Sequence, residues 1–289
     1  MLSLRSSNTS SSTKFRKKKY SSIKEGPVLW IDFTDLRTVY SDTSGTKANP
    51  NIDTIAVVDN KAFNDRFGRS STLCTGTSLR QSDASKQPAL ISGGQNGHVF
   101  ARFDGANDTL FANKSSGNVA TNKLSDSRLN GQAITIFWVA KNDSATPGQE
   151  HLLQIQGHDI SDNTDDPMTI GVKANNYHIF MGNASDKTGD VNQSSSRQAT
   201  TNVELWTIRC AGSSSAYMYA NGDTSDGITN GNTKDQDYAL DANNTGCEIL
   251  LGGGSWDGDI YEILMYSIAL PDKEIKEIER RLKQKYNIT

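Results

Sequence analysis

Cysteine is scarce in this chain: three residues, Cys74, Cys210 and Cys247, stand among 289. Three cysteines cannot form the framework of paired disulfides that small secreted domains use, so the fold must rest on an apolar core. Long apolar runs are absent as well, and no segment approaches the roughly 20 apolar residues of a membrane-spanning helix. These absences exclude a disulfide-stapled scaffold and a helical membrane protein.

Histidine and the common catalytic motifs are equally sparse. The four histidines stand singly in the sequence, without an H-E-x-x-H pair. The serine-rich tracts contain no G-x-S-x-G elbow, and no glycine loop ends in the G-K-[ST] of a phosphate cradle. The sequence therefore predicts neither a histidine-based metal or nucleophile site nor a nucleotide site, and we expect a protein that is not an enzyme and has no cofactor.

The composition is polar without being strongly charged, with 22% charged and 35% hydrophobic residues, 24 glycines and 22 aromatic side chains (nine Phe, nine Tyr and four Trp). Short apolar or alternating segments recur, separated by turns rich in Gly, Asn and Asp, which is typical of antiparallel all-β proteins. The predicted strands are Pro27–Asp35, Ile55–Asp59, His98–Phe103, Ala133–Lys141, Leu152–Gln156, Met168–Val172, Tyr177–Met181, Val203–Cys210, Ser215–Ala220, Glu248–Leu251 and Ile260–Ile268. Asn221-Gly222 is a strong hairpin signal.

The C-terminal segment predicts a single closing helix over about residues 271–286. Pro271 suits the start of a helix, and Asp272 and Glu274 favour its first turn. The apolar residues Ile275, Ile278, Leu282 and Tyr286 recur every three or four positions and form one stripe. Charged residues, Glu279 among them, are expected to fill the opposite face.

The charge is unevenly distributed along the chain. Residues 1–24 carry seven cationic side chains and no carboxylate, and subtracting +7 from the net charge of −3 leaves −10 for the remainder. We therefore divide the chain into a basic N-terminal arm, residues 1–26, and a folded body, residues 27–289. A solvated tail is the plainer interpretation of the arm; we favour an extended segment that binds a partner. Its expected contact residues are Arg5, Lys14, Phe15, Arg16, Lys17, Lys18, Lys19 and Tyr20.

Four segments of the body, in order, carry a resemblance to a known family. They are LWIDFTD at Leu29–Asp35, VFARFDGANDTL at Val99–Leu110, ITIFWVAK at Ile134–Lys141 and the long segment Gly258–Ile288; YMYANG at Tyr217–Gly222 adds a hairpin. Together they resemble the concanavalin A-like, laminin-G-like jelly-roll domains of phage and bacterial surface proteins. The resemblance implies an antiparallel two-sheet jelly-roll sandwich. Function is less well specified, because this fold carries lectins, glucanases and packing modules.

The resemblance, the basic arm and the lack of a secretion signal together favour a virion protein made in the host cytoplasm. We expect a structural protein of a phage tail, fibre or capsid exterior, present in several copies and held to other virion proteins by its arm. Its sandwich would bind host-surface glycans; a membrane or nucleic acid is not an expected partner. The alternatives are a stand-alone carbohydrate-binding module, a cement protein without a sugar ligand, and a glycoside hydrolase.

Candidate ligand-binding residues lie in the predicted loops. Trp256 beside the triple-glycine turn, with Tyr238 and Tyr177, could stack on a sugar, and Asp257 could accept its hydroxyl hydrogen bonds. In the hydrolase alternative, Asp257, Asp259 and Glu262 would resemble the E-x-D-x-x-E motif of laminarinase-type enzymes. A regular strand points Glu262 away from the two aspartates, so only a bulge would bring the three carboxylates to one face.

Calcium is the one ion for which the loops offer oxygen ligands. Asp162, Asp165 and Asp166 crowd one loop, and Asp104, Asn107 and Asp108 another. Neither loop has EF-hand spacing, and such residues commonly form turns by themselves. We therefore expect no resident metal.

Overall fold

The structure is a computed structural model. It describes residues 26–27, 29–62, 78–112, 133–144, 146–156, 168–181, 191–211, 216–230, 248–253, 255–266 and 268–289. Residues 1–25 of the expected arm lie outside the described residues, as do Tyr238 and the loop containing Asp162, Asp165 and Asp166.

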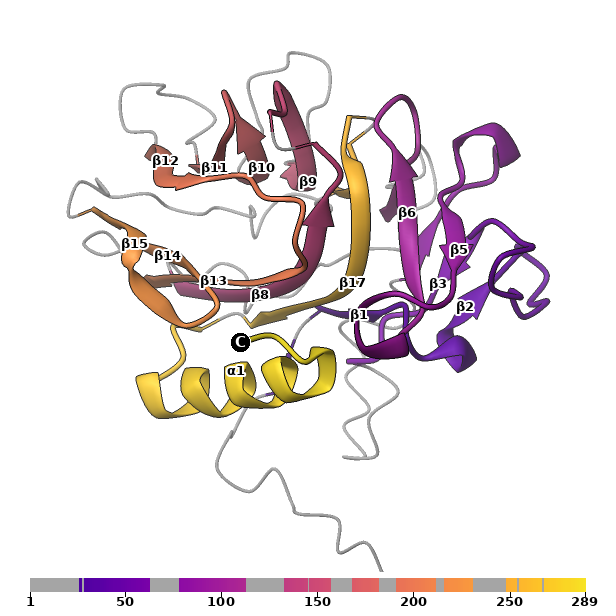
Figure 1. Cartoon of the computed structure of the whole chain (residues 1–289). Helices are drawn as coiled ribbons and strands as arrows, with labels where there is room; N and C mark the ends of the chain where they lie inside the picture. The colour runs from indigo at the N-terminus through magenta and orange to yellow at the C-terminus, as the bar shows by residue number, and fades with distance from the viewer. Residues whose placement is uncertain are drawn as a thin grey trace, which may run out of the picture.

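The body is an all-β sandwich of two antiparallel sheets with one helix on the outside, as predicted (Figure 1). We call the eight-stranded sheet, in the order β15-β14-β13-β8-β17-β6-β5 with β1 added beside β17, sheet A. The nine-stranded sheet, in the order β12-β11-β10-β9-β16-β7-β4-β3-β2, is sheet B. Seven of the fifteen strand pairings, among them β8 with β17 and β9 with β16, join strands that are not consecutive in the sequence, as in a jelly roll.

The strands of sheet A are β1 (Leu29–Asp32), β5 (Ala89–Ile91), β6 (Phe100–Asp104), β8 (Ala133–Asn142), β13 (Glu204–Ala211), β14 (Ala216–Ala220), β15 (Asp223–Asn230) and β17 (Asp257–Tyr266). Those of sheet B are β2 (Val39–Tyr40), β3 (Val57–Val58), β4 (Leu79–Arg80), β7 (Leu110–Ala112), β9 (Gln149–Gln156), β10 (Met168–Lys173), β11 (Asn176–Met181), β12 (Val191–Gln198) and β16 (Glu248–Leu251). The helices are η1 (Leu36–Thr38), η2 (Ala84–Lys86), η3 (Gln95–Gly97) and α1 (Asp272–Tyr286).

The middle of sheet A is buried on both faces, which explains why β8 is apolar along most of its length. Along β8, Ile136 and Trp138 join the core between the two sheets, while Phe137 and Val139 join a second core on the outer face. Because successive side chains of a strand point to opposite faces, a strand that contributes to two cores cannot alternate with polar residues. The predicted strand Ala133–Lys141 is thus confirmed, and it lies between β13 and β17 in the middle of the sheet.

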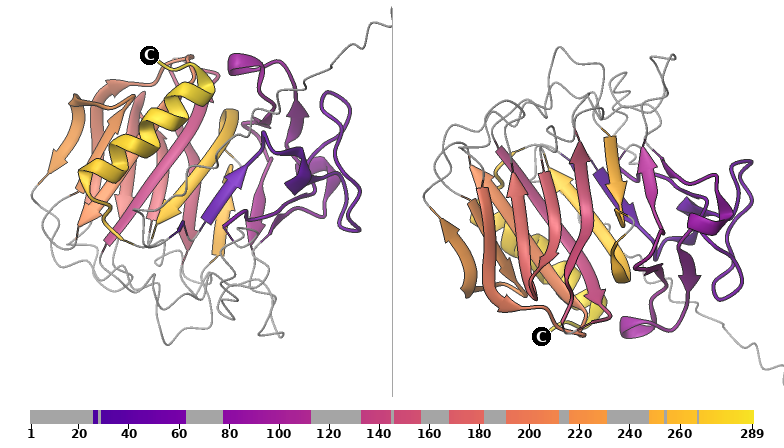
Figure 2. Two further views of the ribbon diagram at one scale, coloured as in Figure 1. Left: turned by 90° about the horizontal axis from the view of Figure 1, so that it is seen from below. Right: turned by 90° about the horizontal axis from the view of Figure 1, so that it is seen from above.

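Helix α1 closes the second core by lying diagonally across the outer face of sheet A (Figure 2). The predicted stripe of Ile275, Ile278, Leu282 and Tyr286 is buried there. Asn287 ends the helix in the left-handed conformation (φ 50°), and the N–H of the cap bonds to the carbonyl of Lys283. The expectation that Glu279 lies on the exposed face is wrong: it is buried and accepts a 2.7 Å hydrogen bond from Thr207.

The Asn221-Gly222 hairpin is confirmed between β14 and β15, with positive φ at both turn residues. Strands β12 and β15 were not predicted, since VNQSSSRQ and DTSDGITN are polar and show no apolar alternation. Within the described residues, no helix is long and apolar enough to cross a membrane.

Candidate functional site

The loops after β6, β8 and β16 meet at one end of the sandwich, where Glu150 of β9 joins the two sheets. Its Oε2 accepts hydrogen bonds from Asn142 Nδ2 (2.7 Å) and from the backbone N–H of Asp257 (3.2 Å). Burial raises the pKa of Glu150, and the nearby carboxylates of Asp257 and Asp143 act in the same direction. This buried junction fixes the start of β9 against the start of β17, so the surface residues beside it hold a defined geometry.

An amide–imidazole group, Gln149, His151 and Gln154, lies on the outer face of sheet B beside this junction. Nε2 of His151 is 3.0 Å from Nε2 of Gln149, and its Nδ1 is 3.1 Å from Nε2 of Gln154. The backbone N–H of His151 donates to Ser255 Oγ at 3.1 Å. Both contacts come from amide nitrogens, which only donate, and a neutral imidazole accepts at one ring nitrogen. One of the two glutamines therefore donates to this ring, which is half-buried.

Two glycines flank His151. Gly171 is its cross-strand partner, and a Cβ there would lie 1.9 Å from the carbonyl oxygen of Glu150. On the other side a Cβ at Gly253 (φ 48°) would lie 2.9 Å from Cβ of His151. Close backbone approach requires glycine at both positions, and it leaves the imidazole without side-chain neighbours from these two residues.

Three aspartates form a row on the outer face of sheet A at the same end. Asp104 of β6 pairs directly with Asp257 of β17, and the N–H of Asp143 donates to the carbonyl of Asp257 at 2.9 Å. Asp104 and Asp143 are exposed and Asp257 is half-buried. We call these three residues the aspartate row.

The next row along the strands carries the cations. Arg102, Asp259 and Lys141 are cross-strand neighbours on β6, β17 and β8. Arg102 holds Asp259 with two hydrogen bonds, 2.7 Å from Nε and 3.0 Å from Nη2, and Lys141 Nζ is 3.8 Å from Asp259 Oδ2. Burial raises the pKa of Asp259 although Arg102 opposes the shift. Lys141 Nζ also lies 2.5 Å from Oδ1 of Asp143, and Arg102 Nε lies 3.9 Å from Oδ2 of Asp143, so both cations contact the aspartate row as well as the buried Asp259.

The loop after β6 is a turn and holds no metal cluster. Oδ1 of Asp104 accepts hydrogen bonds from the N–H groups of Ala106 (2.9 Å), Asn107 (3.1 Å) and Asp108 (3.3 Å). Burial and the charge of Asp104 raise the pKa of Asp108 to about 6. Among the described residues, no three His, Cys, Asp or Glu side chains are placed to share a metal ion.

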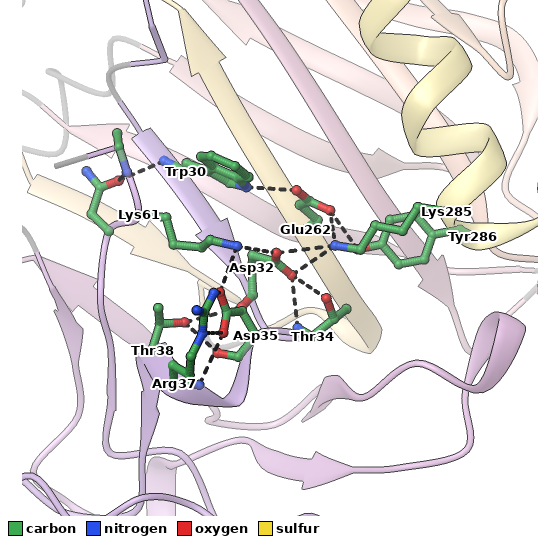
Figure 3. A network of polar contacts seen from close by, with 12 residues as sticks. Trp30, Asp32, Thr34, Asp35, Arg37, Thr38, Lys61, Glu262, Lys285 and Tyr286 are labelled. Atoms are coloured by element: carbon green, nitrogen blue, oxygen red, sulfur yellow. Dashed lines mark hydrogen bonds and ion pairs between the residues drawn. The ribbon is translucent and has the colours of Figure 1, made fainter. Parts of the chain in front are cut away.

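A second polar cluster fastens the end of α1 to sheet A; we call Asp32, Lys61, Glu262, Lys285 and Tyr286 the polar latch (Figure 3). Lys285 Nζ lies 3.2 Å from each carboxylate oxygen of Asp32 and 2.7 Å from Oε2 of Glu262. Tyr286 donates to the same Oε2 at 2.7 Å, and Lys61 donates to Asp32 at 2.7 Å. Both carboxylates are 3% exposed.

Within the latch, the pKa values of the two acids shift in opposite directions. Burial raises the pKa of Glu262, and the charge of Asp32 adds to this despite Lys285 and Tyr286. Burial would also raise the pKa of Asp32, but the charges of Lys285 and Lys61 outweigh it and hold that pKa below its ordinary value. Every partner of the two carboxylates named here is a donor, so Lys285 allows two acids to share one buried site.

The bulge that the hydrolase alternative requires is present. The register of β17 against β8 shifts between Ile260 and Glu262, which turns Tyr261 and Glu262 to the outer face on which Asp257 and Asp259 lie. Glu262 is nevertheless sealed by Tyr286, Lys285 and Trp30, whose Nε1 donates to its Oε1 at 2.7 Å. Asp259 is 2% exposed and held by Arg102. A pair of open carboxyl groups, which glycoside hydrolysis needs, is therefore not formed by these three residues.

The predicted ligand-binding residues differ in their burial. Trp256 is 1% and Tyr177 is 3% exposed, and both belong to the core between the sheets. Tyr177 packs on Trp206 and donates to Glu204 at 2.9 Å. Buried rings present no face on which a sugar can stack. Asp257 alone reaches the surface, and Tyr238 lies outside the described residues; the ligand-binding role of this set stays a prediction.

Sequence reasoning did not find Gln149, Glu150 and Gln154. The predicted strand begins at Leu152, because the preceding Q-E-H shows no apolar alternation, and His151 is a single histidine outside any motif. The signal available is the triple glycine at Gly252–Gly254. It indicates a turn at this point of the chain, but it does not identify the segment that packs against the turn.

The strand pairing and the site define a class, the antiparallel two-sheet β-sandwich with an outer helix. No family model matches the chain, and no curated protein matches its sequence. Similar solved structures include the binding domain of botulinum neurotoxin serotype G (TM-score 0.48, 12% identity, covering 89% of this chain and 51% of that one). Another is the binding domain of Paraclostridial Mosquitocidal Protein 1 (TM-score 0.48, 16% identity, 88% and 52%). A third is the Ruminococcus gnavus IT-sialidase CBM40 bound to alpha2,3 sialyllactose (TM-score 0.41, 14% identity, 54% and 90%). The chain spans about half the length of the toxin domains that it matches.

The polar latch predicts a large penalty for removing its shared cation. Replacing Lys285 with Met leaves two buried carboxylates facing each other and should lower the free energy of unfolding by about 3–5 kcal/mol. The matched control is Lys283→Met on the same helix, which removes one hydrogen bond to the carbonyl of Asn221 and should cost about 1 kcal/mol. Urea unfolding at pH 7 measures both; equal losses would contradict the latch.

Asp108 predicts a pH dependence of stability. Because its folded pKa of about 6 lies above its ordinary value of 3.8, the native state binds this proton more tightly than the unfolded state. The stability that Asp108 contributes is therefore present below pH 4 and lost as the pH rises through 6. Asp108→Asn should raise the free energy of unfolding at pH 7.5 by about 1 kcal/mol and leave it unchanged near pH 4. Asp83→Asn is the control of opposite sign, since its hydrogen bonds with Ser85 lower the pKa of Asp83. A constant difference between Asp108→Asn and wild type across this range would refute the assignment.

Proposed function

We propose that this chain is a non-enzymatic virion structural protein that displays a glycan-binding β-sandwich and is attached to its particle by the basic N-terminal arm. The fold supplies a rigid platform, and one end of it gathers surface polar groups. The phage setting, on a tail, fibre or capsid exterior, is favoured by the four segments that resemble phage-borne jelly rolls and by the charge of residues 1–24.

The observation that carries glycan binding is the half-buried imidazole of His151 held between two glutamine amides. Sugars are recognised by a few accurately placed donors and acceptors on a preformed surface, and amide and imidazole groups can offer both roles. The flanking glycines let the backbones of neighbouring segments pack closely beside the imidazole, which fixes its position. Asp257 and Asp143 supply carboxylate acceptors on the other side of the Glu150 junction.

The arm supports attachment through its composition. Seven cationic side chains without a carboxylate, with Phe15 and Tyr20 among them, offer long-range attraction and a few apolar anchors to an acidic protein surface. A stand-alone carbohydrate-binding module remains the alternative if no particle is involved. Hydrolysis is disfavoured by the sealing of Asp259 and Glu262.

The glycan hypothesis predicts a saturable ligand for the purified chain on an array of bacterial surface glycans. His151→Ala and Gln149→Ala should each weaken that binding at least tenfold, because each removes a hydrogen-bonding group from the ligand surface. Gln198→Ala, an exposed glutamine on β12, is the matched control and should leave the affinity unchanged. Binding that is indifferent to His151 and Gln149 would place the ligand elsewhere and overturn this site.

The attachment hypothesis predicts that a chain lacking residues 1–25 folds normally but is not incorporated into particles. Its circular dichroism and urea midpoint should match those of the full chain, since the sandwich and α1 are built from residues that follow the arm. Incorporation is measured by immunoblotting purified particles after complementation in vivo. Normal incorporation of the truncated chain would exclude the arm as the attachment device.

A further inference from the structure

The polar latch places an amine directly in front of a carboxyl group, with a second acid beside it (Figure 3). Nζ of Lys285 is 3.2 Å from both carboxylate oxygens of Asp32, so it is equidistant from them and close to the carbon between them. Its contact with Glu262 is different, through Oε2 alone at 2.7 Å. Because reacting atoms about 3–3.5 Å apart are within near-attack range, Lys285 is placed to react with Asp32.

The strand register brings the two acids together. Asp32 of β1 and Glu262 of β17 are direct cross-strand partners, so their side chains leave the sheet on the same face. Both acids are 3% exposed, and the fully buried Tyr286 closes the site from α1. Like charges directly opposite each other on a sheet are destabilising, and burial increases that cost. A reaction that consumes one of the two carboxylates removes the repulsion.

The two oxygens of Asp32 have different donors. Oδ1 accepts from the backbone N–H of Thr34 at 3.0 Å and from its Oγ1 at 2.6 Å, and two such donors can stabilise an oxyanion. Oδ2 accepts from Nζ of Lys61 at 2.7 Å, and this cation stabilises negative charge that develops on a leaving oxygen. Oδ1 is therefore the oxygen that stays on the carbon, and Oδ2 is the one that leaves.

We propose that Lys285 and Asp32 condense to an intramolecular isopeptide bond, with Glu262 as the catalytic proton carrier. The bond between Nζ and Cγ forms, and the bond between Cγ and Oδ2 breaks. The ammonium gives up two of its three protons to Glu262, which contacts Nζ and passes them in turn to Oδ2; Oδ2 then leaves as water. An ammonium and a carboxylate thus become a secondary amide and one water molecule, and the balance needs no other reactant.

Burial supports this role for Glu262. Burial and the charge of Asp32 raise the pKa of Glu262, so this acid can hold a proton where an exposed glutamate would release it. A lysine amine is an effective nucleophile when a neighbouring group takes its proton. Effective concentrations of well-oriented intramolecular partners reach about 10⁵–10⁸ M, so a fixed amine and acid can condense although the free groups in water do not.

The amide joins the first strand to the closing helix. Strand β1 pairs with β17 through four residues, Leu29 to Asp32, and the arm directly precedes it. Tension applied through the arm therefore acts first on this short pairing. A covalent bond from Asp32 to Lys285 closes a loop that spans 253 positions and transfers the tension to α1. The bond itself does not depend on glycan binding or on attachment to a particle.

The test is the mass of the full chain, purified and denatured in urea. The wild-type chain should be lighter than its sequence mass by one water molecule. Trypsin should release residues 25–37 joined to residues 284–289, because trypsin does not cleave after an acylated Lys285. This joined peptide distinguishes the isopeptide bond from an aspartate that has lost water by cyclising onto its own backbone.

Two variants and a matched control assign the roles. Lys285→Arg keeps a cation between the two acids but offers no amine, so it should have its full sequence mass. Glu262→Gln keeps the shape of the side chain but cannot carry the proton, and its fraction of joined chain should fall at least tenfold. Lys283→Arg, on the same helix, should be joined as completely as the wild type. Circular dichroism spectra that match the wild type show that the variants fold.

A wild-type chain at its full sequence mass, with residues 25–37 and 286–289 recovered separately, would overturn the proposal. A joined peptide formed through Lys61 or through the carboxyl group of Glu262 would also overturn it, since each names a different amine or acid. Equal joining in Glu262→Gln and wild type would exclude Glu262 as the proton carrier.

Discussion

The structure depends on a single ammonium group placed between two buried carboxylates. Lys285 Nζ contacts both Asp32 and Glu262, which lie on β1 and β17, while Lys285 itself closes α1. Burying either acid alone would cost several kcal/mol. Lys285, Lys61 and Trp30 together give each carboxylate oxygen a donor. The contact joins the first strand, the last strand and the closing helix. With α1 fixed there, the outer face of sheet A can be apolar, and β8 and β17 can be buried on both sides.

The bulge at Tyr261 divides β17 into two parts that pair with different strands and carry different side chains. Before it, β17 pairs with β6 and carries Asp257 and Asp259; after it, β17 pairs with β1 and carries Glu262, Leu264 and Tyr266. The extra residue shifts the alternation, so Tyr261 and Glu262 both face α1, and the N–H of Phe33 bonds to the carbonyl of Tyr261. One strand thus has a half sealed under the helix and a half that ends beside the aspartate row, where Asp257 is half-buried. The aspartate row and the Glu150 junction both lie on the side of the bulge that α1 does not cover.

Much of the fold could be predicted because its signals are local. The apolar run of β8, the stripe of α1 and the Asn221-Gly222 turn each fix a structure within a few residues. The edge strands β12 and β15 could not be predicted, since their polar sequences take strand geometry from their neighbours. Trp256 is a particular case: next to a glycine turn and an aspartate it suggested a ligand platform, but it packs in the core, where its indole nitrogen lacks a partner among the described residues. Contacts between Gln149, His151 and Gln154 depend on a register shift in β9, which no local pattern specifies.

The three carboxylates of β17 show why sequence position alone does not assign a role. Glu262 receives hydrogen bonds from Trp30, Lys285 and Tyr286, and Asp259 receives both from one guanidinium. Their acceptor capacity is committed to the protein, so a ligand would have to displace charged donors from a buried site at a cost of several kcal/mol. Asp257 differs, because its backbone is fixed by Glu150 while its side chain is half-exposed beside Asp104 and Asp143. A carboxylate with a fixed backbone and a solvated head can bind a partner without unfolding its surroundings. The same motif, D-G-D-I-Y-E, therefore provides one surface group and two structural ones, and what separates them is the number of protein donors that each carboxylate already holds.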